Sequence, residues 1–161
     1  MNAYMQRILD TLGSHDPIEV LQATPQRLAD LLEAMAPADL ERSYAPGKWD
    51  ARHVFAHLAD VELAMAFRLR LVIHQPGVEL AAFDQDVWAT RYERSDPALA
   101  VEAFRGQRAW TLSLLTTLTL DDWLAEGLHP ERGVESVDLM VRFLAGHDIN
   151  HVAQLETILA S

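Results

Sequence analysis

The sequence contains no cysteine. Disulfide bonds are therefore excluded, and any metal site must use nitrogen or oxygen ligands. No run of about 18 consecutive apolar residues occurs, so the sequence predicts no membrane-spanning helix. The opening residues 1–7 soon turn polar, so no secretory signal is predicted and a cytoplasmic location is expected.

Basic residues are scarce, with 13 Lys and Arg against 24 Asp and Glu, which gives a formal net charge of −11. Nucleic acids and anionic membranes are bound through basic patches, so this charge argues against both as partners. The acidic residues are scattered along the chain, as expected for a solvated surface.

Several common catalytic motifs are also missing. The chain has no GxGxxG or GxxxxGK[ST] phosphate loop and no GxSxG nucleophile turn. The zinc-protease motif HExxH is absent because Asp148, not Glu, follows His147. No Glu-x-x-His pair falls on a predicted core face, which argues against a carboxylate-bridged di-iron bundle.

What is present predicts helices. With 161 residues, half of them hydrophobic, residues 1–161 are expected to form a single domain with one core. Apolar residues recur at helical spacing, and no run of alternating strand residues is evident. Thr24–Pro25 either restarts or kinks a helix in the N-terminal part. The predicted helices cover residues from about 8 to 32, 51 to 73, 97 to 117 and 136 to 159. Long connections around 78–96 and 121–133 predict an all-α four-helix bundle in which not all neighbours need be antiparallel.

The most informative residues are two histidines, His147 and His151, four apart in the last predicted helix. They lie on the same inward stripe as Met140, Leu144 and Leu155. In the second long helix, His57 occupies the matching position, and the residues on its stripe are Val54, Val61 and Met65. Three imidazoles that meet in a bundle core can hold a divalent cation and leave coordination positions open.

Spacing alone leaves two interpretations open. A single inward histidine is more commonly a core residue bonded to a carbonyl, whereas three unpartnered buried imidazoles would accumulate a polar cost unless a cation bound them. His53 lies four residues before His57 in the first turn and is predicted at the surface or the pocket rim. The other histidines, His15, His74 and His129, are predicted to lie at the surface.

Polar residues flank the candidate ligands. Asp60 or Asn150 could orient an imidazole or accept a proton, while Glu62 and Asp148 are predicted to be solvated. The tryptophans at positions 49, 88, 110 and 123 are predicted to pack in the core.

Five segments together resemble the DinB-like superfamily, over about residues 17–157. The resemblance rests on the order and separation of a Pro-Gly-x-Trp…His-x-x-Asp opening and a His-x3-His closing motif. The segments are Ala45–Asp50, His57–Glu62, Phe83–Trp88, His129–Gly133 and Gly146–Leu155.

This resemblance implies a four-helix bundle with a long crossover between its second and third helices. It also implies a divalent metal held by His57, His147 and His151. Zinc and nickel are the leading metals, since nitrogen ligands suit both. The superfamily includes S-transferases and isomerases that use bacillithiol or mycothiol, and members described only as metal-dependent hydrolases. Dimers are common in it, so a homodimer is expected. Val61 and Glu62 depart from residues that some members carry there, so no proton-transfer role is carried over.

The resulting hypothesis is a metal-dependent enzyme that activates a thiol or water for S-transfer or hydrolysis of a small electrophile. A low-molecular-weight thiol would be the cosubstrate, and Phe83 and Trp88 would wall the pocket. The alternative is a non-catalytic metal-binding or dimerisation bundle. An open coordination position favours the enzyme, and a fourth protein ligand favours the structural role.

Overall fold

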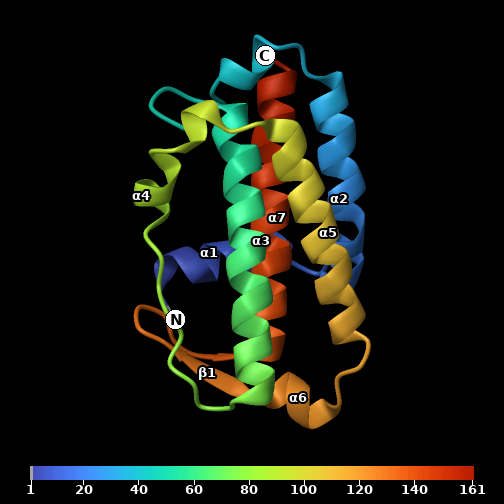
Figure 1. Ribbon diagram of the computed structural model, residues 1–161, viewed down its shortest axis with the longest axis vertical. Helices are drawn as coiled ribbons and strands as arrows, with labels where there is room; N and C mark the ends of the chain where they lie inside the picture. The colour runs from blue at the N-terminus through green and yellow to red at the C-terminus, as the bar shows by residue number, and fades with distance from the viewer. Residues whose placement is uncertain (1) are drawn as a thin grey trace.

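A bundle of four long helices forms the body of the computed structural model, which describes residues 2–161. The helices are α2 (Pro17–Ala34), α3 (Ala51–His74), α5 (Pro97–Leu115) and α7 (Val137–Leu159). Helices α2 and α3 each pack against both α5 and α7. Helices α2 and α7 run in one direction, and α3 and α5 in the other (Figure 1). The predicted all-α four-helix bundle is confirmed.

The connection between α3 and α5 is long because these two neighbours are parallel. Residues 75–96 travel back along the side of the bundle from the end of α3 to the start of α5 (Figure 1). They include the short helix α4 (Gln85–Ala89) and the 3-10 turn η2 (Tyr92–Arg94). This is the predicted crossover between the second and third bundle helices.

A small hairpin closes one end of the bundle. Strands β1 (Glu126–His129) and β2 (Gly133–Ser136) pair antiparallel. The crossover docks on β1, since the Leu80 N–H donates to the Leu128 carbonyl at 2.9 Å and the Leu128 N–H donates to the Val78 carbonyl at 2.8 Å. The prediction of no strands was therefore wrong. Four-residue strands are too short to leave a clear alternation in the sequence.

The remaining elements are α1 (Ala3–Leu12), which crosses α7, the 3-10 turn η1 (Asp39–Glu41) and α6 (Leu120–Leu124). The long helices begin at side chains that accept backbone N–H bonds: Asp16, Asp50, Asp96 and Ser136. Pro25 lies inside α2, which continues through it from Pro17 to Ala34. Thr24–Pro25 is thus not a helix start.

A polar layer divides the hydrophobic core. One apolar cluster joins α1, α3 and α7 near the hairpin, and a second joins α2, α3, α5 and α7 toward the other end. Between them lie buried polar side chains: His57, Glu62, Arg108, Thr111, His147, Asp148 and His151. Bundle cores exclude such groups unless they are paired or bind a ligand, so this layer is where function is expected.

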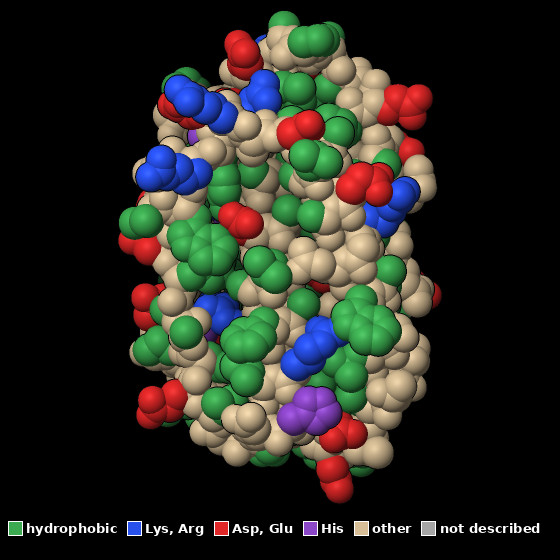
Figure 2. All heavy atoms as spheres, viewed as in Figure 1, with side chains coloured by type: hydrophobic (Ala, Val, Ile, Leu, Met, Phe, Trp, Pro, Cys, Tyr) green, Lys and Arg blue, Asp and Glu red, His purple; other side chains and the backbone are tan. Residues whose placement is uncertain are grey.

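The outer surface carries charged residues and several exposed apolar side chains (Figure 2). Trp110 on α5 is 68% exposed, so its predicted place in the core was wrong; its ring lies beneath Arg70. Phe67 on α3 is 62% exposed. Within residues 2–161 no helix combines the length and apolarity needed to cross a membrane.

Helices α1 and α7 meet at Gly146, directly before His147. A Cβ atom added there would lie 2.2 Å from the Ile8 carbonyl oxygen, which is a clash with backbone. We expect Gly146→Ala to destabilise the fold by about 1–3 kcal/mol, because α1 must move away from α7. Gly106→Ala in α5 is the control, since its Cβ meets nothing within 4 Å. Urea denaturation of both variants is the measurement, and equal stability would contradict the close packing.

Candidate metal centre

The three histidines singled out by helical phasing meet in the polar layer. His57 comes from α3, and His147 and His151 come from adjacent turns of α7. Their exposed fractions are 2%, 2% and 6%. One ring nitrogen from each lies within 4.8 Å of the others, and the Nε2 atoms of His57 and His147 are 3.1 Å apart. Inward placement on both helices is therefore confirmed.

The histidines are held neutral. Burial, followed by the charge of His151, lowers the pKa of His57 to about 3. Burial lowers the pKa of His151 to about 4, although its bond to Gln154 opposes this shift. The pKa of His147 also falls well below its usual value, mainly because of burial. Near pH 7 all three therefore offer lone pairs, the form in which imidazole binds metals.

The hydrogen bonding of the cluster fits a bound cation. The His151 Nδ1 atom lies 2.8 Å from the Gln154 amide oxygen, which leaves its Nε2 free to face the centre. The Nδ1 atoms of His57 and His147 are buried without a partner among residues 2–161, so these two rings, unlike that of His151, have no outer hydrogen bond to orient them. Two Nε2 atoms 3.1 Å apart can both lie about 2.0–2.1 Å from one zinc ion. The donor set, three neutral nitrogens, thus suits a divalent transition metal.

The neighbouring candidates lie outside this cluster. His53 contacts Asp50 through its Nδ1 atom at 2.8 Å, near the start of α3, in keeping with its predicted rim position. Asp60 accepts a hydrogen bond from the Tyr92 hydroxyl at 2.6 Å. Neither contributes a ligand atom to the group of three among the residues described.

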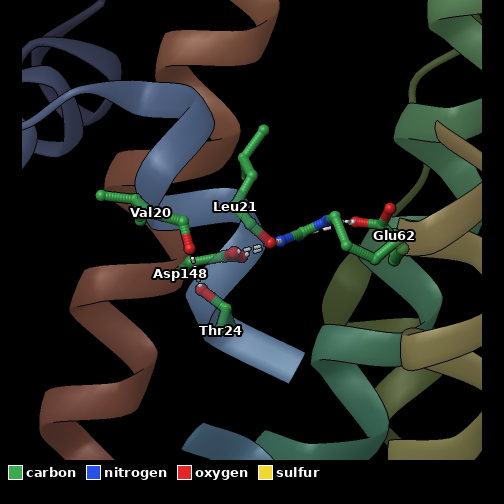
Figure 3. Close-up of polar contacts among 6 residues, drawn as sticks. Val20, Leu21, Thr24, Glu62 and Asp148 are labelled. Atoms are coloured by element: carbon green, nitrogen blue, oxygen red, sulfur yellow. Dashed lines mark hydrogen bonds and ion pairs between the residues drawn. The ribbon is translucent and has the colours of Figure 1, made fainter. Parts of the chain in front are cut away.

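Glu62 and Asp148 are fully buried, so their prediction as solvated side chains was wrong. Both pair with Arg108, which reaches in from α5 and is itself 0% exposed. Arg108 donates to a Glu62 carboxylate oxygen at 2.8 Å and to Asp148 at 2.6 Å (Figure 3). Burial alone would lower the pKa of Arg108, but the two carboxylates raise it. Arg108 therefore stays positively charged in this buried layer.

Arg108 also donates a hydrogen bond to a backbone carbonyl of helix α2 that Pro25 leaves without its helical donor. Pro25 has no N–H, so the Leu21 carbonyl one turn earlier loses its usual helical donor. The Arg108 Nη1 atom donates to this carbonyl at 3.0 Å, and Leu21 is labelled in Figure 3. Nearby, the Thr24 hydroxyl donates to the Val20 carbonyl at 2.9 Å. One guanidinium thus joins α2, α3 and α7 to α5, directly behind His147.

A cavity of about 570 Å³ adjoins the cluster, and His57 and His147 form part of its wall. Phe83 lines it as predicted, whereas Trp88 packs against Phe83 with ring centroids 4.6 Å apart. A second hollow of about 270 Å³, which shares His57, Tyr4 and Gln85 with the first, reaches His151. The cluster can therefore be approached by a small molecule.

Two further residues that the sequence did not identify as functional candidates, His129 and Arg68, line the cavity. His129 was predicted at the surface but is 2% exposed. Its Nδ1 atom accepts the Glu131 N–H at 3.2 Å, which assigns its proton to Nε2. Pro130 beside His129 marks a turn, and turns usually lie at the surface, which is why the sequence favoured a surface position.

The depressed histidine pKa values predict acid sensitivity of the metal-depleted protein. In the unfolded chain these groups titrate near 6.5, but in the folded chain His57 and His151 titrate at about 3 and 4. The unfolded state therefore binds more protons, and stability falls as pH drops below about 6.5. Urea denaturation between pH about 7.5 and 5 measures this loss. A variant with all three histidines replaced by glutamine should lose most of this dependence, and an unchanged slope would contradict it.

The bundle, its crossover and its inward histidine cluster define a class of helical protein with a candidate cation site in its core. The chain belongs to the DinB superfamily, whose family model matches residues 21–155.

Relatives with curated names are similar over most of their length. "Putative metal-dependent hydrolase OB0413" of Oceanobacillus iheyensis is 27% identical over 148 residues, which cover 91% of this chain and 86% of the relative. "Putative metal-dependent hydrolase YfiT" of Bacillus subtilis is 23% identical and is matched over 86% of this chain and 79% of its own length.

Solved structures show the same fold. YfiT from Bacillus subtilis, described as a probable metal-dependent hydrolase with an unusual four-helix bundle topology, has a TM-score of 0.84 at 23% identity, covering 88% of this chain and 83% of YfiT. A mycothiol-dependent maleylpyruvate isomerase has a TM-score of 0.68 at 12% identity. That match covers 86% of this chain but 59% of the isomerase, which is a larger protein.

Proposed function

We propose that this chain is a metal-dependent enzyme in which His57, His147 and His151 hold one divalent ion, either zinc or nickel. The observation that carries the proposal is the buried cluster of three neutral imidazoles with ligand atoms within 4.8 Å of one another. The names given to its relatives as metal-dependent hydrolases support it. No fourth side chain joins the group among residues 2–161, which favours an open coordination position over a closed structural site.

The residues around the cluster have distinct tasks in this proposal. A divalent ion supplies Lewis acidity, which eases the ionisation of a water or thiol. Three neutral ligands leave the full charge of the ion available for that purpose. Gln154 fixes the orientation of His151 through its 2.8 Å contact. His129 lines the cavity, and with its Nδ1 atom accepting from Glu131 we assign it the role of donating a hydrogen bond from Nε2 to a reacting group.

The reaction we propose is transfer of a thiol sulfur to a small electrophile, or hydrolysis of such a substrate. The structural likeness to a mycothiol-dependent isomerase favours a low-molecular-weight thiol as cosubstrate. The test is an activity screen of the metal-loaded protein with thiol conjugation and ester hydrolysis assays, each repeated after metal removal. Full metal loading without activity in either assay would favour a non-catalytic metal-binding or dimerisation bundle.

We further propose that residues 1–161 act as one domain in a cytoplasmic homodimer. Exposed Phe67 and Trp110, on neighbouring helices α3 and α5, support a contact between copies. A cytoplasmic setting agrees with a reduced thiol cosubstrate, because that compartment keeps thiols reduced. Light scattering on the purified full chain measures the oligomeric state, and a monomer at micromolar concentration would reject the dimer.

A further inference from the structure

Arg68 on α3 is a buried cation without a counterion. Its exposed fraction is 5%, and no carboxylate forms an ion pair with it among residues 2–161. Its Nη2 atom donates to the Ala81 carbonyl of the crossover at 2.5 Å. Its other guanidinium nitrogens make no hydrogen bond in the described part of the chain and are not fully enclosed by protein. Arg68 is one of the residues that line the cavity beside the histidine cluster. Burying a charge in this way is costly unless an anion completes its contacts.

The charged neighbours of Arg68 do not complete those contacts. Arg132 lines the same cavity, and its own charge is taken by Glu135, whose Oε2 atom lies 2.9 Å from Arg132 Nη2. Asp84 accepts the backbone N–H groups that begin α4. Glu131 also lines the cavity but forms no ion pair with Arg68 in residues 2–161. Burial, and then the charge of Arg132, lowers the pKa of Arg68, although the carboxylates of Glu135 and Glu131 oppose this shift.

Aromatic rings hold both guanidinium groups in place. Arg68 lies over the Phe83 ring, with 5.4 Å from Cζ to the ring centroid, and Arg132 lies over Phe143 at 5.3 Å. A guanidinium stacked on a ring keeps its N–H edge free, and this edge matches the two oxygens of a carboxylate or phosphate. The guanidinium of Arg68 and the histidine cluster therefore line the same cavity.

We propose that Arg68 anchors an anionic group of the substrate, a carboxylate or phosphate, while the reacting part of the same molecule faces His57 and His147. The substrate class is then a small organic anion that fits within about 570 Å³. The catalytic part of this inference rests on the proposed function. The anion subsite itself does not, because it can be measured by binding alone.

Calorimetric titration of the zinc-loaded full chain tests the subsite, with succinate and inorganic phosphate as probes and uncharged succinamide as the control ligand. We expect Arg68→Met to weaken binding of the preferred anion about 10- to 100-fold. Arg68→Lys, which keeps the charge but not the two-pronged edge, should give an intermediate loss. Arg105→Met is the matched control, because Arg105 is exposed and pairs with Glu102. Zinc content and circular dichroism of each variant verify loading and folding.

Four outcomes would overturn the subsite. The first two are equal anion affinity in wild type and Arg68→Met, and binding of succinamide as tight as that of the anions. The other two are the absence of binding of either anion by the wild type, and anion binding that is lost on removal of zinc but kept in Arg68→Met. The proposed function fails separately. If anion binding depends on Arg68 but the loaded protein shows no activity, the subsite stands and the enzyme assignment falls.

Discussion

Replacing His147 with alanine is expected to abolish stoichiometric metal binding. Loss of an outer-shell partner already costs metal sites about 10- to 100-fold in affinity, so loss of a direct ligand should exceed about 100-fold. The variant should remain helical, because the bundle is also held by its two apolar clusters. Elemental analysis after dialysis measures the ratio of metal to protein, and thermal unfolding with added zinc measures the stabilisation that binding confers.

The control for this prediction is His74→Ala, since His74 is exposed at the end of α3. It should retain the wild-type metal ratio and the wild-type response to zinc. His57→Ala and His151→Ala should behave like His147→Ala if the three residues form one site. One-to-one metal retained in all three variants would reject the cluster as the metal centre.

The second large effect is expected at Arg108, whose replacement by methionine should destabilise the fold by about 3–5 kcal/mol. Methionine preserves much of the volume but leaves Glu62 and Asp148 as buried carboxylates without a cation. It also leaves the Leu21 carbonyl, freed by Pro25, without a donor. For a domain of this size the melting temperature should fall by roughly 6–20 °C.

A matched variant tests whether the removal of any positive charge from α5 would cause the same loss of stability. Arg105→Met removes an exposed guanidinium one turn earlier on α5 and should change stability by less than about 1 kcal/mol. Adding Glu62→Gln and Asp148→Asn to Arg108→Met should recover part of the lost stability, because the unpaired charges are then gone. A loss below about 1 kcal/mol in Arg108→Met alone would show that the network is not stabilised by pairing.

The helices and the three histidines could be predicted because both follow from local periodicity. An apolar stripe of period 3.6 decides which face of α7 turns inward, and His147 and His151 lie on that stripe. The same rule separates His57 from His53 on α3. The lengths of the two long connections indicated only that not all neighbouring helices need be antiparallel. The crossover between the second and third helices was implied by the family resemblance.

The polar layer could not be predicted because its partners are remote in sequence. Glu62 and Asp148 look like solvated acids in their own helices, and their burial depends on Arg108, 46 and 40 residues away. Likewise, Arg68 and His129 become cavity residues only when the hairpin and crossover dock together. The burial of these side chains depends on tertiary contacts, which local sequence patterns do not predict.

The four-way role of Arg108 has a consequence for how the bundle comes apart. Its guanidinium is satisfied only when α2, α3 and α7 are all in place around α5. If one helix detaches, a charged group or the Leu21 carbonyl loses its partner while it is still partly buried. Partly opened forms therefore carry a free-energy cost that the fully unfolded chain, whose polar groups are solvated by water, does not carry. Local opening is thereby disfavoured relative to all-or-none unfolding, and the geometry behind His147 stays constant until the whole bundle opens.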